Sequence, residues 1–357
     1  MTLKKIFLNT TERAKSYIRG LLSVTAVITF TLILVPSHAV DAKDKFIFAN
    51  GSAYDTMDPQ VVFDVGRVAY RLNLYDGLMR WLDNPPKLNP WLAESYDISN
   101  DGTRYTFKLR NAVFHDGSPV EAKDVVYSIE RILALKKGAS SLFVKVIKPG
   151  STKAIDSKTV EFNLSKSSAI FLATVPEIHV MNSDLLKKHE KDGDWGSAWV
   201  SKNDAGSGSF KLKRYDPAKG FLAERFKDHF MGWGDKYLDE IEFRTVTEIN
   251  SRVLGLMKGD FHGADGYMPQ DQIKRLIKSD EVNVSEEESM RIFYFIIHNG
   301  RSPMNDINFR KALSYSFDYD GFIKNILSNS VARNPVPLPN NIWGAPKGVS
   351  GYTYDLE

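Results

Sequence analysis

The residues of this 357-residue chain that could do chemistry form none of the common catalytic patterns. An α/β-hydrolase needs a Gly-x-Ser-x-Gly turn, a zinc protease needs His-Glu-x-x-His on one helix, and a phosphate loop ends in Gly-Lys-Ser/Thr. The sequence contains none of the three, and it has no cysteine that could act as a nucleophile. We therefore interpret the chain as a binding protein and not an enzyme, with a secreted hydrolase as the weaker alternative.

His115 and Asp116 stand side by side, as a general base and its carboxylate would. Both lie in a Phe-His-Asp-Gly sequence, however, where aspartate typically caps the backbone amides of a turn. The other histidines lack the spacing of metal ligands; they are His38, His179, His189, His229, His262 and His298. The sequence therefore predicts structural histidines, no metal and no cofactor.

Three local structures follow one another without a break over residues 88–131. Apolar side chains alternate with polar ones over 96–98 and 105–109, which predicts two strands with one buried face. Asn100-Asp101-Gly102 between them is a turn former, so the strands should pair as a hairpin. Apolar residues then recur at helical spacing, at Val125, Ile129, Ile132 and Leu133. The run predicts a hairpin, a turn and an amphipathic helix.

The rest of the sequence predicts further strands and helices, interleaved without strict alternation, which favours mixed α/β domains. The expected strands are 45–49, 159–164, 241–246 and 291–297. Helices are expected at 67–78 and 308–325, and another should begin at Thr247 as N-cap and end at Gly259. The run 206–209 is rich in glycine and serine and precedes a strand, so it predicts a tight turn and not a phosphate cradle.

The first 42 residues have the layout of a secretory signal peptide. Basic residues precede an apolar run over 21–35, and small residues would allow cleavage after Ala39 or Ala42. That run is shorter than the roughly 20 residues of a membrane span, which disfavours an uncleaved anchor. Residues 43–357 carry 42 basic and 42 acidic side chains. A neutral mature chain without cysteine favours a periplasmic protein that is not a lipoprotein, and it gives no reason to expect nucleic acid as a partner.

The run at 88–131 resembles the family 5 extracellular solute-binding proteins of bacterial ABC importers, the oligopeptide- and dipeptide-binding group. Members carry a similar "LAESW…DDG…YTFHLR…FHDG.P…A.DVV.S..R" sequence. Later segments are similar to further family motifs in the same order; they are 208–212, 233–241, 254–260, 309–315 and 354–355. The resemblance covers nearly the whole chain from Phe46 onward.

The resemblance implies a mixed α/β protein of two lobes, the peptide-binding cluster of the class II periplasmic-binding-protein fold. Lobe one would span 43–285, with an inserted subdomain at about 75–200, and lobe two would begin at 286. Members are usually much longer, so the second lobe is expected to be incomplete. A fragment, a split gene and a pseudogene product are the alternatives left open.

The function implied by the resemblance is that of a periplasmic receptor. It would bind a short peptide, or a similar small solute, between its lobes by hinge closure, as a monomer. It would then deliver the ligand to an inner-membrane ABC permease with its ATPase. The alternative within the same family is a non-functional truncated remnant.

The resemblance also supplies the candidate ligand contacts. One stretch aligns with family residues that lie extended along the ligand, where the backbone can pair with a peptide as an added strand. An ordinary packed loop is the alternative for this stretch, and core packing is the alternative for the aromatic candidate near the cleft. The candidates are Val62, Phe63, Asp64, Val65, Phe143 and Tyr267. Arg67 and Arg71 are expected to be solvated.

Overall fold

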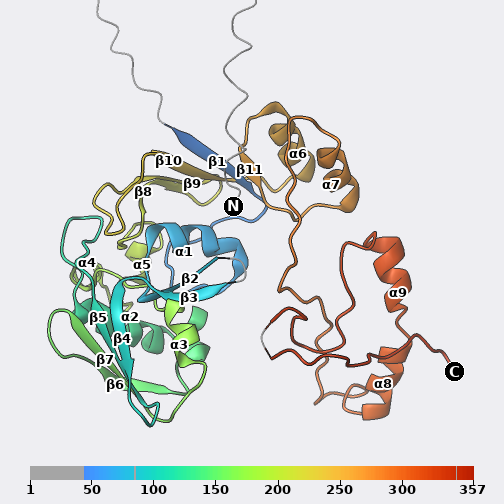
Figure 1. Ribbon diagram of the computed structural model, residues 1–357, viewed down its shortest axis with the longest axis horizontal. Helices are drawn as coiled ribbons and strands as arrows, with labels where there is room; N and C mark the ends of the chain where they lie inside the picture. Colours follow the sequence, from blue (N-terminus) through green and yellow to red (C-terminus); the bar gives the residue numbers. More distant parts are fainter. Residues whose placement is uncertain (1–43, 84–85, 343) are drawn as a thin grey trace, which may run out of the picture. The chain divides into compact units, whose positions relative to one another are not determined.

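The computed structural model describes residues 44–83, 86–342 and 344–357, so the predicted signal peptide at 1–42 lies outside the described residues. Among those residues, no helix combines the length and the apolar character that a membrane crossing requires. Strands and helices are mixed along the chain, which confirms the predicted α/β class (Figure 1).

The strands are β1 (Lys45–Asn50), β2 (Met79–Leu82), β3 (Lys87–Pro90), β4 (Ala93–Ile98), β5 (Arg104–Leu109), β6 (Ile147–Ala154), β7 (Thr159–Leu164), β8 (Phe210–Asp216), β9 (Gly220–Arg225), β10 (Glu240–Thr245) and β11 (Gly263–Ala264). The helices are α1 (Val68–Leu74), α2 (Ala122–Leu135), α3 (Phe171–Thr174), α4 (Ser183–His189), α5 (Ser197–Val200), α6 (Ile249–Lys258), α7 (Gln270–Ile277), α8 (Ile307–Tyr315) and α9 (Tyr319–Gly321).

The main sheet has five strands in the order β11-β1-β10-β9-β8. Strand β1 runs parallel to both β10 and β11, whereas β10, β9 and β8 pair antiparallel. Helix α1 packs on this sheet, because Tyr70 and Leu74 share one buried cluster with Phe221 and Ile241. The predicted strands at 45–49 and 241–246 are confirmed.

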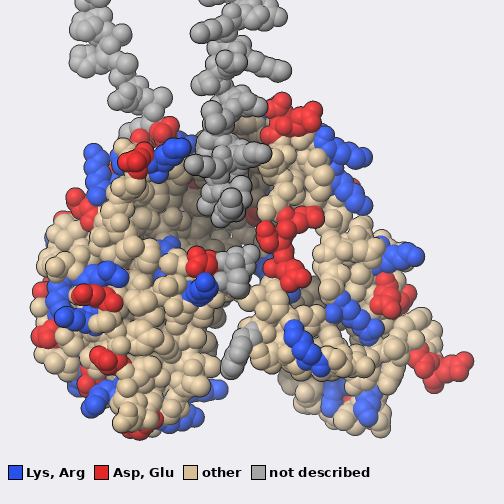
Figure 2. Space-filling model, in the orientation of Figure 1, with Lys and Arg blue, Asp and Glu red and all other residues tan. Residues whose placement is uncertain are grey.

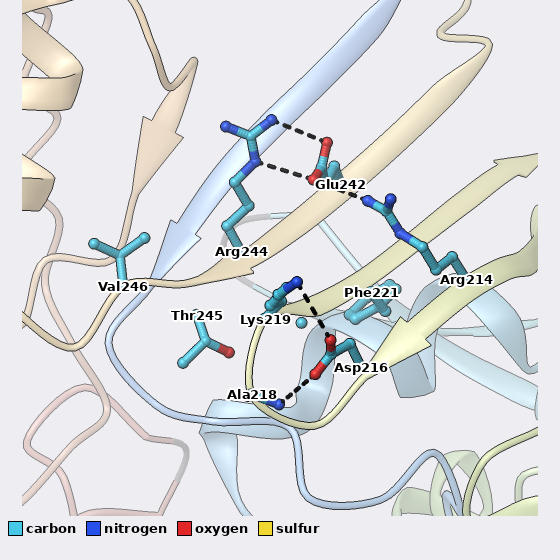
Figure 3. A pocket seen from close by; sticks show the side chains of 10 residues that line it. Arg214, Asp216, Ala218, Lys219, Phe221, Glu242, Arg244, Thr245 and Val246 are labelled. Carbon is cyan, nitrogen blue, oxygen red and sulfur yellow. Dashed lines mark hydrogen bonds and ion pairs between the residues drawn. The ribbon is translucent and has the colours of Figure 1, made fainter.

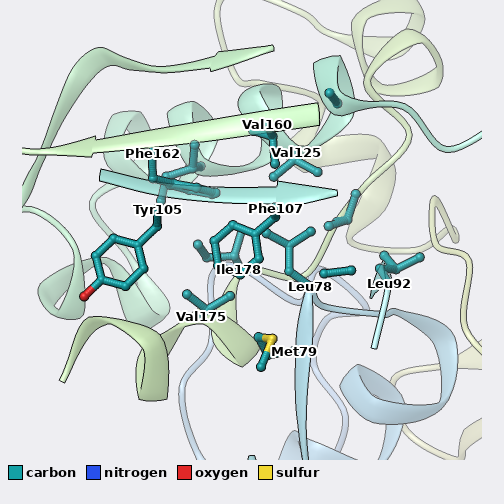
Figure 4. Close-up of a cluster of buried hydrophobic side chains, with 14 of the residues drawn as sticks. Leu78, Met79, Leu92, Tyr105, Phe107, Val125, Val160, Phe162, Val175 and Ile178 are labelled. Atoms are coloured by element: carbon teal, nitrogen blue, oxygen red, sulfur yellow. The ribbon is translucent and has the colours of Figure 1, made fainter. Parts of the chain in front are cut away.

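A second, antiparallel sheet has the order β4-β5-β7-β6, with β5 paired to β4 and to β7. The predicted hairpin is therefore confirmed, with Gly102 at a positive φ of 66° in its turn. Helix α2 contacts β6 and β7. Figure 4 shows the buried cluster that results, in which Phe107 lies near Val125 and Ile178. Every fully buried member of this cluster lies between residues 78 and 180.

Two glycines in the run 206–209 are required by close packing. A Cβ on Gly208 would lie 2.3 Å from the backbone oxygen of Asn73, and one on Gly206 would lie 1.9 Å from that of Leu74. The amide of Gly208 donates a hydrogen bond to Leu74 O at 3.0 Å. The run is thus a tight connection against the end of α1 that leads into β8, as the sequence predicted.

Some predicted elements are wrong in detail. The helix at 67–78 is shorter, and that at 308–325 is divided into α8, α9 and a π-turn at Phe322–Ile326. Glu248, and not Thr247, is the N-cap of α6, although Gly259 ends it with φ 78° as expected.

No strand forms at 291–297, and no described residue hydrogen-bonds to the backbone of 292–297. A strand needs a neighbouring chain to pair with its amides and carbonyls, and no described residue supplies such a pairing for this segment.

Candidate functional site

One edge of the main sheet collects the segments that the sequence singled out. Because β1, β10 and β11 are parallel, their carboxyl ends meet at the same edge, at Asn50, Thr245 and Ala264. The chain that contains 62–65 leaves from β1, and the chain that contains Tyr267 leaves from β11. Ligands of open α/β sheets typically bind outside the carboxyl ends of the strands, so the topology places both candidates where a ligand could be received.

The main chain of 61–63 has hydrogen-bonding groups with which no described residue pairs. None of Val61, Val62 and Phe63 makes a backbone hydrogen bond to another described residue. Asp64, which follows, is extended, with φ −144° and ψ 164°. Unpaired amides and carbonyls are costly unless water or a ligand satisfies them. This stretch can therefore offer both donors and acceptors to an extended peptide.

The side chains of this stretch divide into two kinds. Phe63 is 50% exposed and Val65 is 59% exposed, so both present apolar surface to solvent. Asp64 instead turns back to the protein, because its Oδ1 accepts from the amide of Arg67 at 3.1 Å and its Oδ2 pairs with that guanidinium at 2.8 Å. Asp64 thus caps the 3₁₀ turn at Val65–Arg67, and the exposed apolar side chains are those that a ligand can touch.

A fully buried ion pair fixes the start of this stretch. The Arg131 guanidinium donates to both carboxylate oxygens of Asp58, at 3.0 and 2.6 Å, and to Gln60 Oε1 at 3.0 Å. Gln60 Nε2 donates in turn to the carbonyls of Ser128 and His179. Breaking such a pair is expensive because it leaves a buried charge uncompensated. Sequence reasoning missed this anchor.

Arg71 is buried, so the expectation of a solvated side chain was wrong. It is 5% exposed, its Nη1 donates to Glu177 Oε2 at 2.7 Å, and its Nη2 donates to the carbonyl of Asp64 at 3.3 Å. The guanidinium carbon also lies 6.0 Å from the centre of the Phe63 ring. Arg71 therefore joins the candidate segment to Glu177, a residue with no motif signal in the sequence. Arg67 is partly exposed and pairs with Asp55 and Asp64.

Phe143 lies in the core of the second sheet, with no exposed surface. The turn before it does approach the candidate segment, since a Cβ on Gly138 would lie 2.3 Å from the carbonyl oxygen of Gln60. Gly138 has a positive φ of 53°, which together with this approach requires glycine. Phe143 thus packs as the alternative interpretation expected, and it is not included in the site proposed below.

Tyr267 is 57% exposed and lies beside a buried arginine. Arg252 Nη2 donates to the carbonyl of Tyr267 at 3.2 Å, and Arg252 pairs with Asp265 at 3.6 Å. The guanidinium carbon of Arg291 lies 4.4 Å from the centre of the Tyr267 ring. The ring is accessible, and its backbone is held by the Arg252 side chain.

A polar pocket of about 390 Å³ opens at the same edge of the sheet (Figure 3). Glu242 accepts two hydrogen bonds from Arg244 and lies 3.6 Å from Arg214, and Lys219 lies 3.9 Å from Asp216. Burial alone would raise the pKa of Glu242, but hydrogen bonds from Arg244 and Lys45 lower it to about 2. The charged side chains that line the pocket are thus largely paired with one another.

The histidines have structural surroundings. His115 Nδ1 lies 2.6 Å from Asp204, and its Nε2 lies 2.9 Å from the carbonyl of Gly208. Burial would lower the pKa of His115, but the nearby Asp204 carboxylate raises it. Within the described residues, no group of three or more His, Cys, Asp or Glu side chains could hold a metal ion. His115 thus joins its turn to the run before β8.

The mixed α/β fold is that of the bacterial extracellular solute-binding proteins. The family model "Bacterial extracellular solute-binding proteins, family 5 Middle" matches residues 87–357. The chain belongs to this family, as the sequence resemblance indicated.

Several relatives are named for dipeptides. The chain is 31% identical over 351 residues to the probable D,D-dipeptide-binding periplasmic protein DdpA of Escherichia coli (strain K12), covering 96% of this chain and 66% of the relative. It is 26% identical to the dipeptide-binding protein of the same organism, covering 92% and 61%. The chain thus spans less than two thirds of the length of these relatives.

Solved structures agree on the fold. The periplasmic binding protein DppA from Helicobacter pylori, in complex with the peptide STSA, matches with a TM-score of 0.78 and 27% identity over 88% of this chain and 64% of that chain. The oligopeptide-binding protein AppA from Bacillus subtilis, in complex with a nonapeptide, matches with a TM-score of 0.77 over 88% and 62%. Its 20% identity supports the fold alone.

Proposed function

We propose that this chain is the periplasmic ligand-binding component of an ABC importer and that its ligand is a short peptide or a similar small solute. The observation that carries the proposal is the stretch 61–63, whose backbone groups make no hydrogen bond to any described residue. The exposed side chains of Phe63 and Val65 lie in the same segment. An extended peptide can pair with such a stretch as an added strand. The names of the dipeptide-binding relatives support the same ligand class.

The proposed ligand contacts are the backbone of Val62 and Asp64, the side chains of Phe63 and Val65, and the ring of Tyr267. The proposed domains are a signal peptide at 1–42, lobe one at 43–285 with an insertion at about 75–200, and the start of lobe two at 286. The insertion is supported by the buried cluster that lies entirely between residues 78 and 180. The receptor would act as a monomer, without catalysis, in the periplasm, and would present its ligand to a permease with its ATPase.

Hinge closure is the proposed mechanism. A ligand shifts an open–closed equilibrium only by the difference between its affinities for the two forms. A change from mostly open to mostly closed needs roughly 5 kcal/mol of that difference, whereas micromolar binding supplies about 8 kcal/mol in total. Contacts with one lobe alone are therefore insufficient, and the ligand must touch both.

Titration calorimetry with N-methylated peptides tests the backbone pairing. The full chain is titrated with a tetrapeptide and with variants methylated at one amide each, which removes a donor without changing the protein. We expect methylation at alternate amides to weaken binding about tenfold, since each lost hydrogen bond costs about 1 kcal/mol or more. Binding that is indifferent to methylation at every position would contradict the proposal.

A further inference from the structure

The polar pocket at the edge of the main sheet contains hydrogen-bond donors that no described residue uses. Arg214 lies 3.6 Å from Glu242 and Lys219 lies 3.9 Å from Asp216, and both distances are too long for a hydrogen bond. Neither cation donates a side-chain hydrogen bond to any described residue. The hydroxyl oxygen of Thr245 is buried and also lacks a partner among these residues. Figure 3 shows the three side chains around the same pocket.

The charge that remains in the pocket is positive. Arg244 donates to both oxygens of Glu242, at 3.0 and 3.2 Å, and Lys45 forms an ion pair with the same carboxylate. Burial would raise the pKa of Glu242, but these two cations lower it to about 2, so the carboxylate stays ionised beside them. Glu242 is thus neutralised without Arg214. The described residues that line the pocket include three cations and two acids, which are Arg214, Lys219, Arg244, Asp216 and Glu242.

The pocket borders the loop that leads to the proposed peptide site. Phe221, in its wall, packs edge-on against Tyr54 with ring centres 5.1 Å apart. Tyr215 Oη donates to the carbonyl of Tyr54 at 2.7 Å. The loop that contains Tyr54 continues into the stretch 61–63, whose backbone makes no hydrogen bond to any described residue. One loop therefore contacts the pocket wall and carries the backbone that we propose for ligand pairing.

We infer that this pocket receives a carboxylate of the ligand, the side chain of an acidic residue in a peptide bound along 61–63. The inference rests on the proposed function, which it deepens by naming the class of peptide that is preferred. An ionised carboxylate only accepts hydrogen bonds, and the unused groups of the pocket are a guanidinium, an ammonium and a hydroxyl group. Bonds between such ions are roughly twice as strong as neutral ones.

The size of the pocket agrees with this ligand group. Its volume of about 390 Å³ lies within the range of small-molecule sites, so an acidic side chain can enter it. Phe221, Ala218 and Val246 supply apolar surface for the methylene groups. A bound carboxylate would also satisfy the buried Thr245 hydroxyl, which is costly to leave without a partner.

Calorimetry with matched peptides tests the inference on the full chain. Alanine tetrapeptides with glutamate at one position are compared with their glutamine counterparts. All are amidated at the carboxyl terminus, so that the glutamate side chain is their sole carboxylate. We expect a preference for glutamate of about 5- to 20-fold at one position, and of less than about twofold at the others. The preference should decrease at higher ionic strength, because salt screens exposed charges.

Two variants test the assignment to this pocket. Arg214→Gln and Lys219→Gln should each reduce the preference for glutamate, and the double variant should bring it to near one. These side chains are 67% and 84% exposed, so the thermal melts should stay unchanged. Lys211→Gln is the matched control, because Lys211 lies on the same strand as Arg214 but pairs with Glu224 at 3.4 Å outside the pocket. It should keep the preference.

The carboxyl terminus of a peptide is the other source of a carboxylate. An all-alanine tetrapeptide with a free or an amidated carboxyl terminus separates the two sources. We expect any preference for the free acid to be the same in the unmodified chain and in the double variant. A preference that disappears in the double variant would mean that the pocket receives the terminus, and the inference of an acidic side chain would be wrong.

The outcomes distinguish the inference from the function on which it rests. If the unmodified chain binds glutamate and glutamine peptides equally at every position, the inference is overturned and the peptide receptor stands. If it binds none of the peptides, the proposed function fails and the inference fails with it. If the double variant keeps the full preference while its thermal melt matches that of the unmodified chain, the carboxylate binds elsewhere and the assignment to this pocket is wrong.

Discussion

Two segments rich in aromatic residues, both predicted to be strands, have opposite surroundings in this molecule. In β5, Phe107 is fully buried, and the strand pairs with β4 on one side and β7 on the other. In 291–297, Phe295 is 71% exposed, and the backbone of 292–297 makes no hydrogen bond to any described residue. A side-chain pattern indicates a strand in both places, but a strand forms only where a neighbour pairs with its backbone.

The comparison implies that stability resides in the paired region. The partners of β5 come from within 93–164 and are joined to it by short connections. No described residue pairs with the backbone of 292–297, and its aromatic side chains are largely exposed, so they contribute little to the free energy of unfolding. On the face of the molecule shown in Figure 2, positive and negative side chains are mixed.

The largest expected difference is between two phenylalanine truncations. Phe107→Ala should reduce the free energy of unfolding by about 3–5 kcal/mol, because it opens a cavity in a close-packed cluster. Phe295→Ala should change it by less than about 0.5 kcal/mol, as for most exposed positions. Urea denaturation of the full chain followed by circular dichroism measures both. Equal losses would mean that 291–297 is buried in solution, and the comparison would be wrong.

Arg131→Met should cost about 3 kcal/mol, because it leaves the Asp58 carboxylate buried without its cation. Arg301→Met, at an exposed position outside the paired region, is the matched control and should be nearly neutral. Adding Asp58→Leu to Arg131→Met should recover most of the loss, since two apolar side chains can replace a buried pair. If the double variant is less stable than Arg131→Met, the Asp58–Arg131 pair contributes more to stability than the neutralisation of two buried charges. Denaturant midpoints supply the readout.

Gly208→Ala tests the connection that packs against α1. Its new Cβ would lie 2.3 Å from a backbone oxygen, and we expect a loss of about 1–3 kcal/mol from overpacking. Gly234→Ala is the control, because a Cβ there meets nothing within 4 Å. Thermal melts of both variants give the comparison. An unchanged melting temperature for Gly208→Ala would show that α1 and the run 206–209 are less tightly packed than described.

The smallest expected effect concerns pH. Burial lowers the pKa of His115, but Asp204, the carbonyl of Gly208 and Asp76 together raise it above its usual value, so protonation of His115 favours the folded state. This contribution is fully present below the unfolded value of about 6.5 and is lost as pH rises through the raised folded value. Melting temperatures from pH 5 to 9 should therefore show a decrease that is smaller in His115→Gln. His298→Gln, at an exposed position, should retain the slope of the unmodified chain.

The sequence predicted those parts of the fold that depend on local pairing. The hairpin at 96–109 has its turn and both strands within one short run, so alternation and Asn-Asp-Gly were sufficient. The sequence also predicted helix α6 and its end at Gly259. It did not identify the N-cap, because Thr247 and Glu248 are adjacent and only the backbone angles distinguish them. The prediction of a strand at 291–297 was wrong because a run of apolar side chains carries no information about whether a partner strand is present.

The candidate site was only partly accessible to sequence reasoning. The stretch 62–65 came from the family resemblance, and its role stays a prediction. Sequence reasoning missed two ion pairs. Arg71 and Glu177 are 106 residues apart in the chain, and Asp58 and Arg131 are 73 residues apart, and periodicity gives no signal over such separations. Arg71 lies on a short helix in which Tyr70 and Leu74 are also buried. Only tertiary packing could identify its partner.

Hydrogen exchange at the amides of Val62 and Phe63, with and without a bound peptide, tests the central claim most directly. These amides have no acceptor among the described residues, so they should exchange rapidly in the free protein. If a peptide pairs with this stretch, the two amides should slow by at least tenfold at saturating peptide, while the amides of β5 stay unchanged. A peptide that binds by calorimetry but leaves Val62 and Phe63 in rapid exchange would contradict the account.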